Sequence, residues 1–503
     1  MSLEQAAHQS PFFAKLDTPL RVQFHSGEVN ANATGSLPPP LPDHAVRPAR
    51  PTWFRRHHRL TALVLAFLVL KALLAGLYLR QARDEPPPDL SDLDIPRPPE
   101  IPDDQNAYVL LARAAAAAQT PFLQTRKNDI HALATGTLRD DALHAELLAH
   151  AEACNLWPQV AAALAAPLAQ APWRVSLDSP IPEIGQVRFL AQYMIIRAIG
   201  EARRADTRQA VQTLRDVFAV GTIIENSSTS LIHYLTGLAI KTVALDATRH
   251  IAVTQPLSGE DLRFAIGAVR ESRINPENTR RVFRLELNFF RLCLDEVVRH
   301  PEGLYTLSPE TDNTRGVHRC LAALQKLRLT FKPNKTTRLY AENLREVIRL
   351  IGKDGTAVAS SVIADSLEYP PFTNPDNFFG IVFLRIVTPT WSKILQNDVR
   401  HGSAFSATEA FLALRLYALE HDNTLPATLD ALVPDYLPAV PRDHADGKPI
   451  RYSREFHALW SVGENNLDVT RAGQKPEKRD LILDLAFADP AAPADQEPAP
   501  LHL

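Results

Sequence analysis

Cysteine is scarce in this sequence: its 503 residues include three, Cys154, Cys293 and Cys320. So few cysteines exclude a dense disulfide framework and leave room for a single bridge, and sequence alone does not say whether any pair lies close enough to form one. Cys293 falls within the apolar helical pattern LNFFRLCLDEVV, so we expect it to be a core residue and not a nucleophile.

Neither sign of charge dominates. The 54 Lys and Arg residues are balanced by 57 Asp and Glu residues, for a net charge of −3. This balance excludes the strong basic field typical of nucleic-acid-binding domains, and we expect no nucleic-acid partner. Glycine is also sparse, with 19 residues against 40 prolines. The prolines gather in linker-like stretches and near the C-terminus, which divides the chain into segments.

Familiar catalytic and cofactor motifs are missing as well. The sequence contains no HExxH, CxxC, GxSxG, GxGxxG or GxxxxGK[ST] pattern, so we assign no catalytic or cofactor-binding residue. His131, His144 and His150 lie near one another in a polar helical region. A spacing of six residues does not place the last two on one helical face, so we expect surface histidines there and no metal site.

One long apolar run stands out, residues 60–79, LTALVLAFLVLKALLAGLYL. A helix of this length covers the ~30 Å core of a bilayer, and its Leu, Val and Phe residues favour insertion by several kcal/mol. Lys71 opposes insertion by about 2.5–3.5 kcal/mol, which does not reverse the balance. We therefore expect a single transmembrane helix, with the lipid bilayer as partner. Lys71 either meets an acidic group of another membrane protein or is a tolerated charge.

The flanks of this run predict its orientation. Two arginines follow it within fifteen residues, Arg80 and Arg83, whereas five precede it: Arg47, Arg50, Arg55, Arg56 and Arg59. This bias places the N-terminus in the cytoplasm. The run begins at residue 60 with no A-x-A site close behind, so we expect an uncleaved signal-anchor. A composition rich in Ala, Leu and Arg is typical of GC-rich bacteria, which gives a bacterial inner-membrane protein with residues 80–503 in the periplasm.

The remaining chain divides by composition. We expect a disordered cytoplasmic tail at 1–59, a stiff Pro-rich stalk at 80–104 that lifts the next domain off the membrane, and a helical domain at 105–402. A small α+β module follows at 403–488 and a disordered tail at 489–503. The predicted fold class is mainly α.

Helical periodicity fills the 105–402 domain. NAYVLLARAAAAAQ is rich in helix formers, and two amphipathic stretches at 186–204 and 207–224 surround a polar turn at Ala205-Asp206. A third helix is predicted from Leu231 to Ile251, and the rhythm resembles an α-hairpin array of the tetratricopeptide kind. Further helices are predicted at 259–272, 276–299, 317–330, 336–352 and 376–400.

The C-terminal module changes in character. Ser406 and Glu409 form a capping-box pattern before AFLALRLYALEHD, which predicts a helix beginning there. Strands are predicted at Ile450–Tyr452, Phe456–Val462 and Asp480–Leu485, giving a short antiparallel sheet.

This module resembles the globular end of the major pseudopilin of type II secretion systems. The resemblance rests on ALRLYALEHDNTLP, LDALVPDYLPAVPRD, DGKPIRYS and LWSVG, which occur in that order, and it implies a helix packed on a small antiparallel sheet that makes assembly contacts. The chain departs from that family because its apolar helix lies over 300 residues upstream and lacks the Gly-Phe-Thr-Leu-type cleavage motif. The family's calcium loop implies a set of oxygen ligands: Glu464, Asn466, Asp468 and Asp480. The alternative is a solvated polar loop.

The order of anchor, helical middle and terminal module also resembles a group of membrane-anchored proteins from planctomycete- and verrucomicrobia-like bacteria, which implies a layout but no chemistry. Two functions follow. The first is a non-catalytic scaffold or interaction protein of the envelope, with another envelope protein as its partner. The alternative is a hydrolase-like envelope enzyme with its site in the helical domain, for which Asp365, Glu368 and Asp376 are the acids to inspect.

Overall fold

The computed structural model describes residues 58–177, 184–300, 330–352, 375–388, 390–463 and 482–485. Helices dominate these residues, and one short antiparallel sheet lies near the C-terminus, so the predicted mainly α class is confirmed. The tail expected at 489–503, nearly all of that at 1–59 and nearly all of the helix expected at 317–330 lie outside these ranges.

The described residues begin with α2 (His58–Ala82) and the turn η1 (Asp103–Gln105). Short helices come next: α3 (Ala107–Ala117), α4 (Pro121–Gln124), α5 (Lys127–Ala134), α6 (Asp141–Ala153) and α7 (Leu156–Ala165). Longer ones follow: α8 (Ile184–Arg203), α9 (Thr207–Ser227), α10 (Leu231–Thr254), α11 (Gly259–Glu271), α12 (Pro276–Arg299), α14 (Pro333–Leu350), η4 (Pro375–Asn377), α16 (Phe378–Val387) and α17 (Thr390–Glu420). The C-terminal part contains η5 (Leu429–Leu432), β1 (Arg451–Ser453), β2 (Ala458–Trp460) and β3 (Ile482–Asp484).

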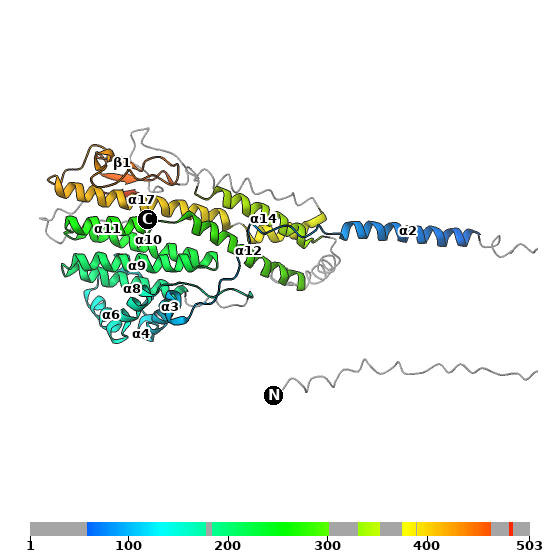
Figure 1. Ribbon diagram of the computed structural model, residues 1–503, viewed down its shortest axis with the longest axis horizontal. Coiled ribbons are helices and arrows are strands. Elements are labelled where there is room, and N and C mark those ends of the chain that lie inside the picture. Colours follow the sequence, from blue (N-terminus) through cyan, green and yellow to red (C-terminus); the bar gives the residue numbers. More distant parts are fainter. Residues whose placement is uncertain are drawn as a thin grey trace, which may run out of the picture. The chain divides into compact units, whose positions relative to one another are not determined.

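The predicted succession of helical hairpins is present. α8 and α9 flank the expected polar turn, and the Asp206 carboxylate caps α9 by accepting a hydrogen bond from the backbone N–H of Gln209. α9 packs between α8 and α10, and α17 lies against α10 and α11, so the helices form successive layers (Figure 1).

The α9–α10 contact is close enough to require glycine. A Cβ placed on Gly237 would lie 2.7 Å from the carbonyl oxygen of Gly221 and 2.8 Å from the backbone nitrogen of Glu225. Real Cβ atoms do not approach other atoms so closely, so the two helices can cross here only without side chains. The crossing brings Glu225 of α9 against Lys241 of α10, where they form a fully buried ion pair.

Two large clusters of buried apolar side chains form most of the core of the described residues, and a third, small cluster contains Ala445 and Val462. Of the two large clusters, the larger joins α3 to α11 with the second half of α17 and the sheet, and the smaller joins α12, α14 and α16 with the first turns of α17. α10 contributes to both, through Tyr234 and Leu238 in the smaller cluster and Leu245 and Ile251 in the larger. α10 and α17 therefore connect the two halves of the core.

The helix expected at 376–400 and the one expected to begin at Ser406 are both wrong in their bounds. Helix α16 ends at Val387, and α17 then runs from Thr390 to Glu420 without interruption. Ser406 and Glu409 lie in its middle and are buried, so they do not form a capping box. Glu409 is held by Arg270 and Arg273, which tie α17 to the end of α11 and to the turn after it. The boundary expected between residues 402 and 403 falls inside this helix.

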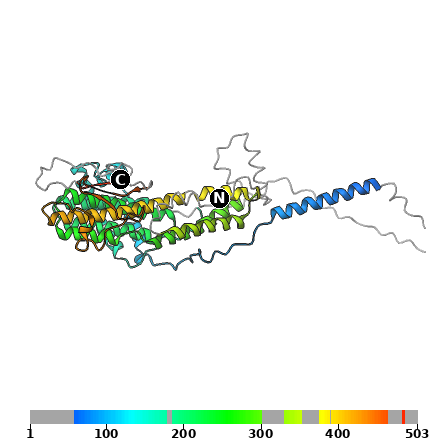
Figure 2. The same ribbon diagram turned by 90° about the horizontal axis from the view of Figure 1, so that it is seen from above.

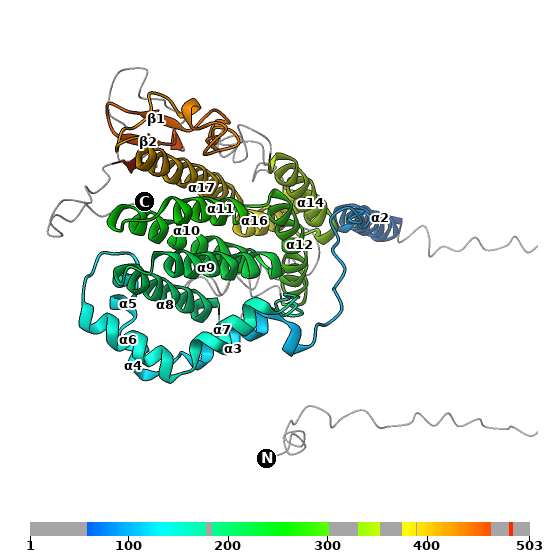
Figure 3. The ribbon, with the colours of Figure 1, turned by 60° about the vertical axis from the view of Figure 1, so that its left-hand side comes forward.

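The expected strands are confirmed, each within or one residue from its predicted range. β2 pairs antiparallel with both neighbours, in the order β1-β2-β3, with Tyr452 opposite Leu459 and Leu459 opposite Leu483. The sheet lies over α17 (Figure 3). The fully buried carboxylate of Asp443 joins them, since it accepts hydrogen bonds from the hydroxyls of Ser403 in α17 and Ser461 after β2.

The Pro-rich segment is docked along the helices and does not form the expected stalk at 80–104. Residues 83–102, which we call the strap, run beside α12 and α14 (Figure 2). Leu93 is buried in the smaller core cluster, and on either side of it Asp92 pairs with Arg345 and Asp94 pairs with Arg291. Prolines keep a segment extended, but an extended segment with apolar and acidic side chains can bind along a helical surface as readily as it can stand free.

Within the part of the chain that the structure describes, two segments are long and apolar enough to cross a membrane, Leu60–Ala82 and Phe378–Glu420. They differ in burial. Half of the apolar stretch in Phe378–Glu420 is buried inside the protein, whereas none of the apolar stretch in Leu60–Ala82 is buried. The second segment comprises α16 and α17, which are core helices. The first is α2.

Candidate functional site at the junction of the strap and helix α14

Two acidic residues at the start of the strap hold it to α14. The Asp84 carboxylate accepts hydrogen bonds from the backbone N–H groups of Asn334 (2.8 Å) and Lys335 (3.2 Å), in the first turn of α14. The residue preceding this helix, Lys332, supplies no side-chain cap. Asp84 therefore caps α14 from a distant part of the sequence, where its negative charge also meets the positive end of the helix dipole.

Glu85 makes the second link. Its carboxylate receives two hydrogen bonds from Arg338, at 2.7 and 3.3 Å, and Arg338 also donates to Glu342 one turn further along α14. The hydrogen bond from Arg338 lowers the pKa of Glu85. The side chain of Asn334 donates to the Glu85 carbonyl oxygen at 2.7 Å, so both the backbone and the side chain of Glu85 accept hydrogen bonds from α14.

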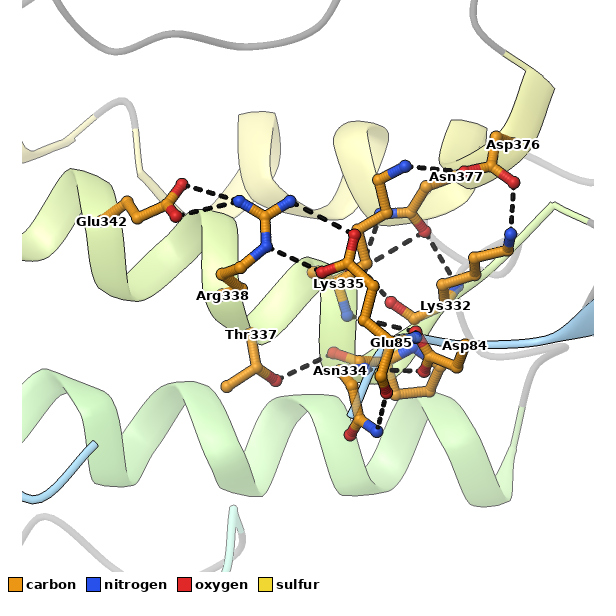
Figure 4. Close-up of polar contacts among 12 residues, drawn as sticks. Asp84, Glu85, Lys332, Asn334, Lys335, Thr337, Arg338, Glu342, Asp376 and Asn377 are labelled. Atoms are coloured by element: carbon orange, nitrogen blue, oxygen red, sulfur yellow. Dashed lines mark hydrogen bonds and ion pairs between the residues drawn. The ribbon is translucent and has the colours of Figure 1, made fainter. Parts of the chain in front are cut away.

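Asp376, in η4, completes the cluster (Figure 4). Lys332 and Lys335 both form ion pairs with its carboxylate, and Gln81, near the end of α2, donates to it at 3.4 Å. Burial alone would raise the pKa of Asp376, but the hydrogen bonds from the two lysines outweigh it and lower the pKa. We call the set formed by Asp84, Glu85, Lys332, Lys335, Arg338 and Asp376 the clamp.

The contacts of the clamp suit it to holding two segments together. Its three carboxylates are bound by cations or backbone N–H groups of the same chain, which leaves them poorly suited to act as bases. Partly exposed ion pairs contribute about 0–1 kcal/mol each, so the clamp holds the strap through several contacts and not through one strong contact. Asp376, one of the acids singled out in the sequence, thus has a structural role, and Asp365 and Glu368 lie outside the described ranges.

A second polar cluster is buried between α10, α12 and α17. Asp398 accepts hydrogen bonds from the hydroxyls of Tyr234, at 2.5 Å, and Thr279, at 2.8 Å. Burial raises the pKa of Asp398 to about 7. At the start of α10, the Glu286 carboxylate of α12 accepts a hydrogen bond from the backbone N–H of Leu231, and burial raises the pKa of Glu286 to about 7 as well.

A serine–histidine pair lies at the start of α10. The Ser230 hydroxyl and Nδ1 of His233 are 3.0 Å apart, and the Tyr108 hydroxyl is 3.1 Å from Nε2. This has the form of a nucleophile and its base. However, both side chains are buried, and burial lowers the pKa of His233 to about 4, which makes it a weak base. The pair is better suited to order the first turn of α10 than to catalyse a reaction.

These buried groups predict how stability depends on pH. The pKa of Asp398 is higher in the folded protein than in the unfolded chain, so its contribution to stability is present at low pH and lost as pH rises toward and beyond 7. In the wild-type protein this loss lowers the free energy of unfolding between pH 5 and pH 8. We expect that decrease to be smaller in Asp398→Asn, as measured by urea unfolding of the full-length protein in detergent. Asp435→Asn, at an exposed site, is the matched control and should leave the pH profile unchanged. An identical profile in all three proteins would show that Asp398 stays ionised when buried.

The sequence-predicted metal ligands lie outside the described residues: Glu464, Asn466, Asp468 and Asp480. Within the described ranges, no group of three or more His, Cys, Asp or Glu side chains could hold a metal ion. The three histidines considered above make separate contacts: His131 with Gln192, His144 with the carbonyl oxygen of Ile196, and His150 with Thr120. The expectation of a surface residue is wrong for His144, which is buried between α6 and α8. Cys154 and Cys293 are free thiols, and Cys320 lies outside the described ranges. Cys293, expected in the core, is partly buried and packs against the smaller core cluster.

No local pattern predicts the clamp, because Asp84 and Glu85 bind residues that are 250 and 253 positions further along the chain. The one local signal is the acidic pair Asp84-Glu85, which directly precedes the prolines at 86–88. No family model, curated protein or solved structure matches the chain.

Proposed function

We propose that this chain is a single-pass anchored protein of the bacterial inner membrane, with residues 60–79 in the bilayer, the N-terminus in the cytoplasm and residues 80–503 in the periplasm. The observation that carries the proposal is the complete exposure of the apolar window in α2. Leaving such a helix in water would expose Leu, Val and Phe side chains, each of which is worth about 1.5–3 kcal/mol when buried. A bilayer removes that cost.

We further propose a non-catalytic role for the periplasmic part, as a scaffold or interaction protein that binds another envelope protein. Supporting it, the clamp and the buried Ser230–His233 pair have the contacts of structural elements. The pseudopilin resemblance supports assembly contacts through the C-terminal module, where a helix carries a small antiparallel sheet. In intact cells, cross-linking followed by purification of the full-length protein should recover one reproducible partner.

The alternative, a hydrolase-like envelope enzyme, has one specific observation in its favour, the 3.0 Å contact between Ser230 and His233. It predicts that Ser230→Ala abolishes a hydrolytic activity of the purified protein while leaving its unfolding transition in place. If a substrate screen finds an activity that this substitution removes, the scaffold proposal is wrong.

The anchor and its orientation have a direct test. We expect the full-length protein to stay with membranes after carbonate extraction, and a variant lacking residues 60–79 to be released. A reporter active only outside the cytoplasm should be active when fused after Leu503. Activity of a cytoplasm-only reporter at that position would reverse the orientation, and release of the full-length protein by carbonate would refute the anchor itself.

A further inference from the structure

The segment that connects α2 to the clamp is very short. Arg83 alone separates Ala82, the last residue of α2, from Asp84. Three helical residues after Leu79 rise about 4.5 Å, and two further residues span at most about 7 Å. Asp84, bound to the first turn of α14, is therefore within about 12 Å of the level of Leu79.

This spacing has a consequence if residues 60–79 span the bilayer, so the inference rests on the anchor proposed above. The headgroup layer of a bilayer is about 5–7 Å thick on each side. The clamp would then lie at its outer edge, whereas a free Pro-rich stalk would have placed the helices far away. We propose that the clamp end of the protein, formed by the start of the strap, the first turn of α14 and η4, docks on the headgroups of anionic phospholipids.

The charges at this end fit such a surface. The acids of the clamp are neutralised within the chain: Asp84 by the N-terminus of α14, Glu85 by Arg338, and Asp376 by two lysines. Arg80 and Arg83, in contrast, are exposed, and neither forms an ion pair with any residue that the structure describes. The charges left over at this end are positive.

Arginine is suited to this contact because its planar guanidinium donates two parallel hydrogen bonds to a phosphate group. Both arginines lie at the level of the headgroups, one in the last turn of α2 and one directly after it. The clamp ties the segment that follows Arg83 to α14. A contact between the two arginines and the headgroups would therefore fix which end of the protein faces the bilayer.

Hydrogen–deuterium exchange on the full-length protein in lipid nanodiscs tests the proposal. We expect the backbone amides of residues 84, 85, 89–92 and 334–338 to exchange more slowly in discs of phosphatidylcholine with phosphatidylglycerol than in discs of phosphatidylcholine alone. Each arginine near an anionic surface strengthens binding about fivefold, so R80Q/R83Q should weaken docking about 25-fold and remove the difference. R204Q/R454Q, which removes two exposed arginines elsewhere, should keep it.

The outcomes separate this inference from the anchor. A protein that fails to float with lipid vesicles refutes the anchor. A protein that floats but shows the same exchange in both lipid compositions keeps the anchor and overturns the docking. Slow exchange seen only in native membranes would mean that a protein, and not lipid, covers this end, which also overturns it.

Discussion

Lys241→Met is expected to lower the free energy of unfolding by about 3–5 kcal/mol, because it leaves a buried carboxylate without its counter-ion. Lys241 and Glu225 are each 1% exposed, and their ion pair lies beside the glycine crossing of α9 and α10. Within the described ranges, the only other side chain that donates to the Glu225 carboxylate is Asn278, at 3.1 Å, which carries no charge. Arg281 donates to the backbone carbonyl oxygen of Glu225, at 3.4 Å, and not to its carboxylate. Methionine keeps the aliphatic volume of lysine, so the loss would come from the charge and not from a cavity.

Denaturant unfolding of the full-length protein in detergent, followed by tryptophan fluorescence, measures this loss. Lys393→Met, at an exposed site of α17, is the matched control and should change the unfolding free energy by less than about 0.5 kcal/mol. The double variant E225Q/K241M removes both charges and should recover most of the stability. If Lys241→Met alone has little effect, water reaches Glu225 and the α9–α10 contact is looser than described.

Local patterns predicted what depends on local physics. The apolar spacing of 186–204 and 207–224 and the polar turn between them gave α8 and α9 within a few residues, because amphipathic periodicity and an N-cap aspartate act over one or two helical turns. The glycines at 221 and 237 could not be paired from sequence, since their proximity depends on how α9 and α10 cross.

The strap shows where composition misled. Prolines and acids between residues 84 and 104 indicated a solvated stalk, yet Leu90 and Leu93 lie among them at a spacing of three residues. Leu93 is buried in the core and Leu90 packs against it. Two acids of this segment, Asp92 and Asp94, bind arginines of α14 and α12, and no local pattern identifies these partners.

The capping-box pattern at Ser406 and Glu409 failed for a related reason. A Ser-x-x-Glu sequence is satisfied equally well by a helix start and by a mid-helix glutamate that forms a tertiary ion pair. Here Arg270 and Arg273 bind Glu409, so this glutamate joins α17 to the end of α11 and does not mark a helix start. A helix start at Ser406 had made the C-terminal module look separable from the helical domain.

Deletion of residues 403–488 is therefore expected to abolish cooperative unfolding of the helical part, contrary to what a separable module would give. The deletion removes the second half of α17, which packs against α10 and α11. Its five fully buried large side chains are Phe405, Phe411, Leu412, Leu414 and Leu416. At about 1.5–3 kcal/mol each, their burial is comparable to the whole stability of a typical domain, about 5–15 kcal/mol.

Circular dichroism and denaturant unfolding of the truncated protein test this expectation, with deletion of residues 489–503 as the control that should leave the transition unchanged. A cooperative transition in the 403–488 deletion would show that the two parts have separate cores. If the transition is lost, a binding partner that disappears with the deletion says nothing about where it was bound, because the whole body has unfolded. The partner surface then has to be mapped with exposed substitutions on an intact fold, such as Leu419→Ser at the end of α17, whose side chain is 52% exposed.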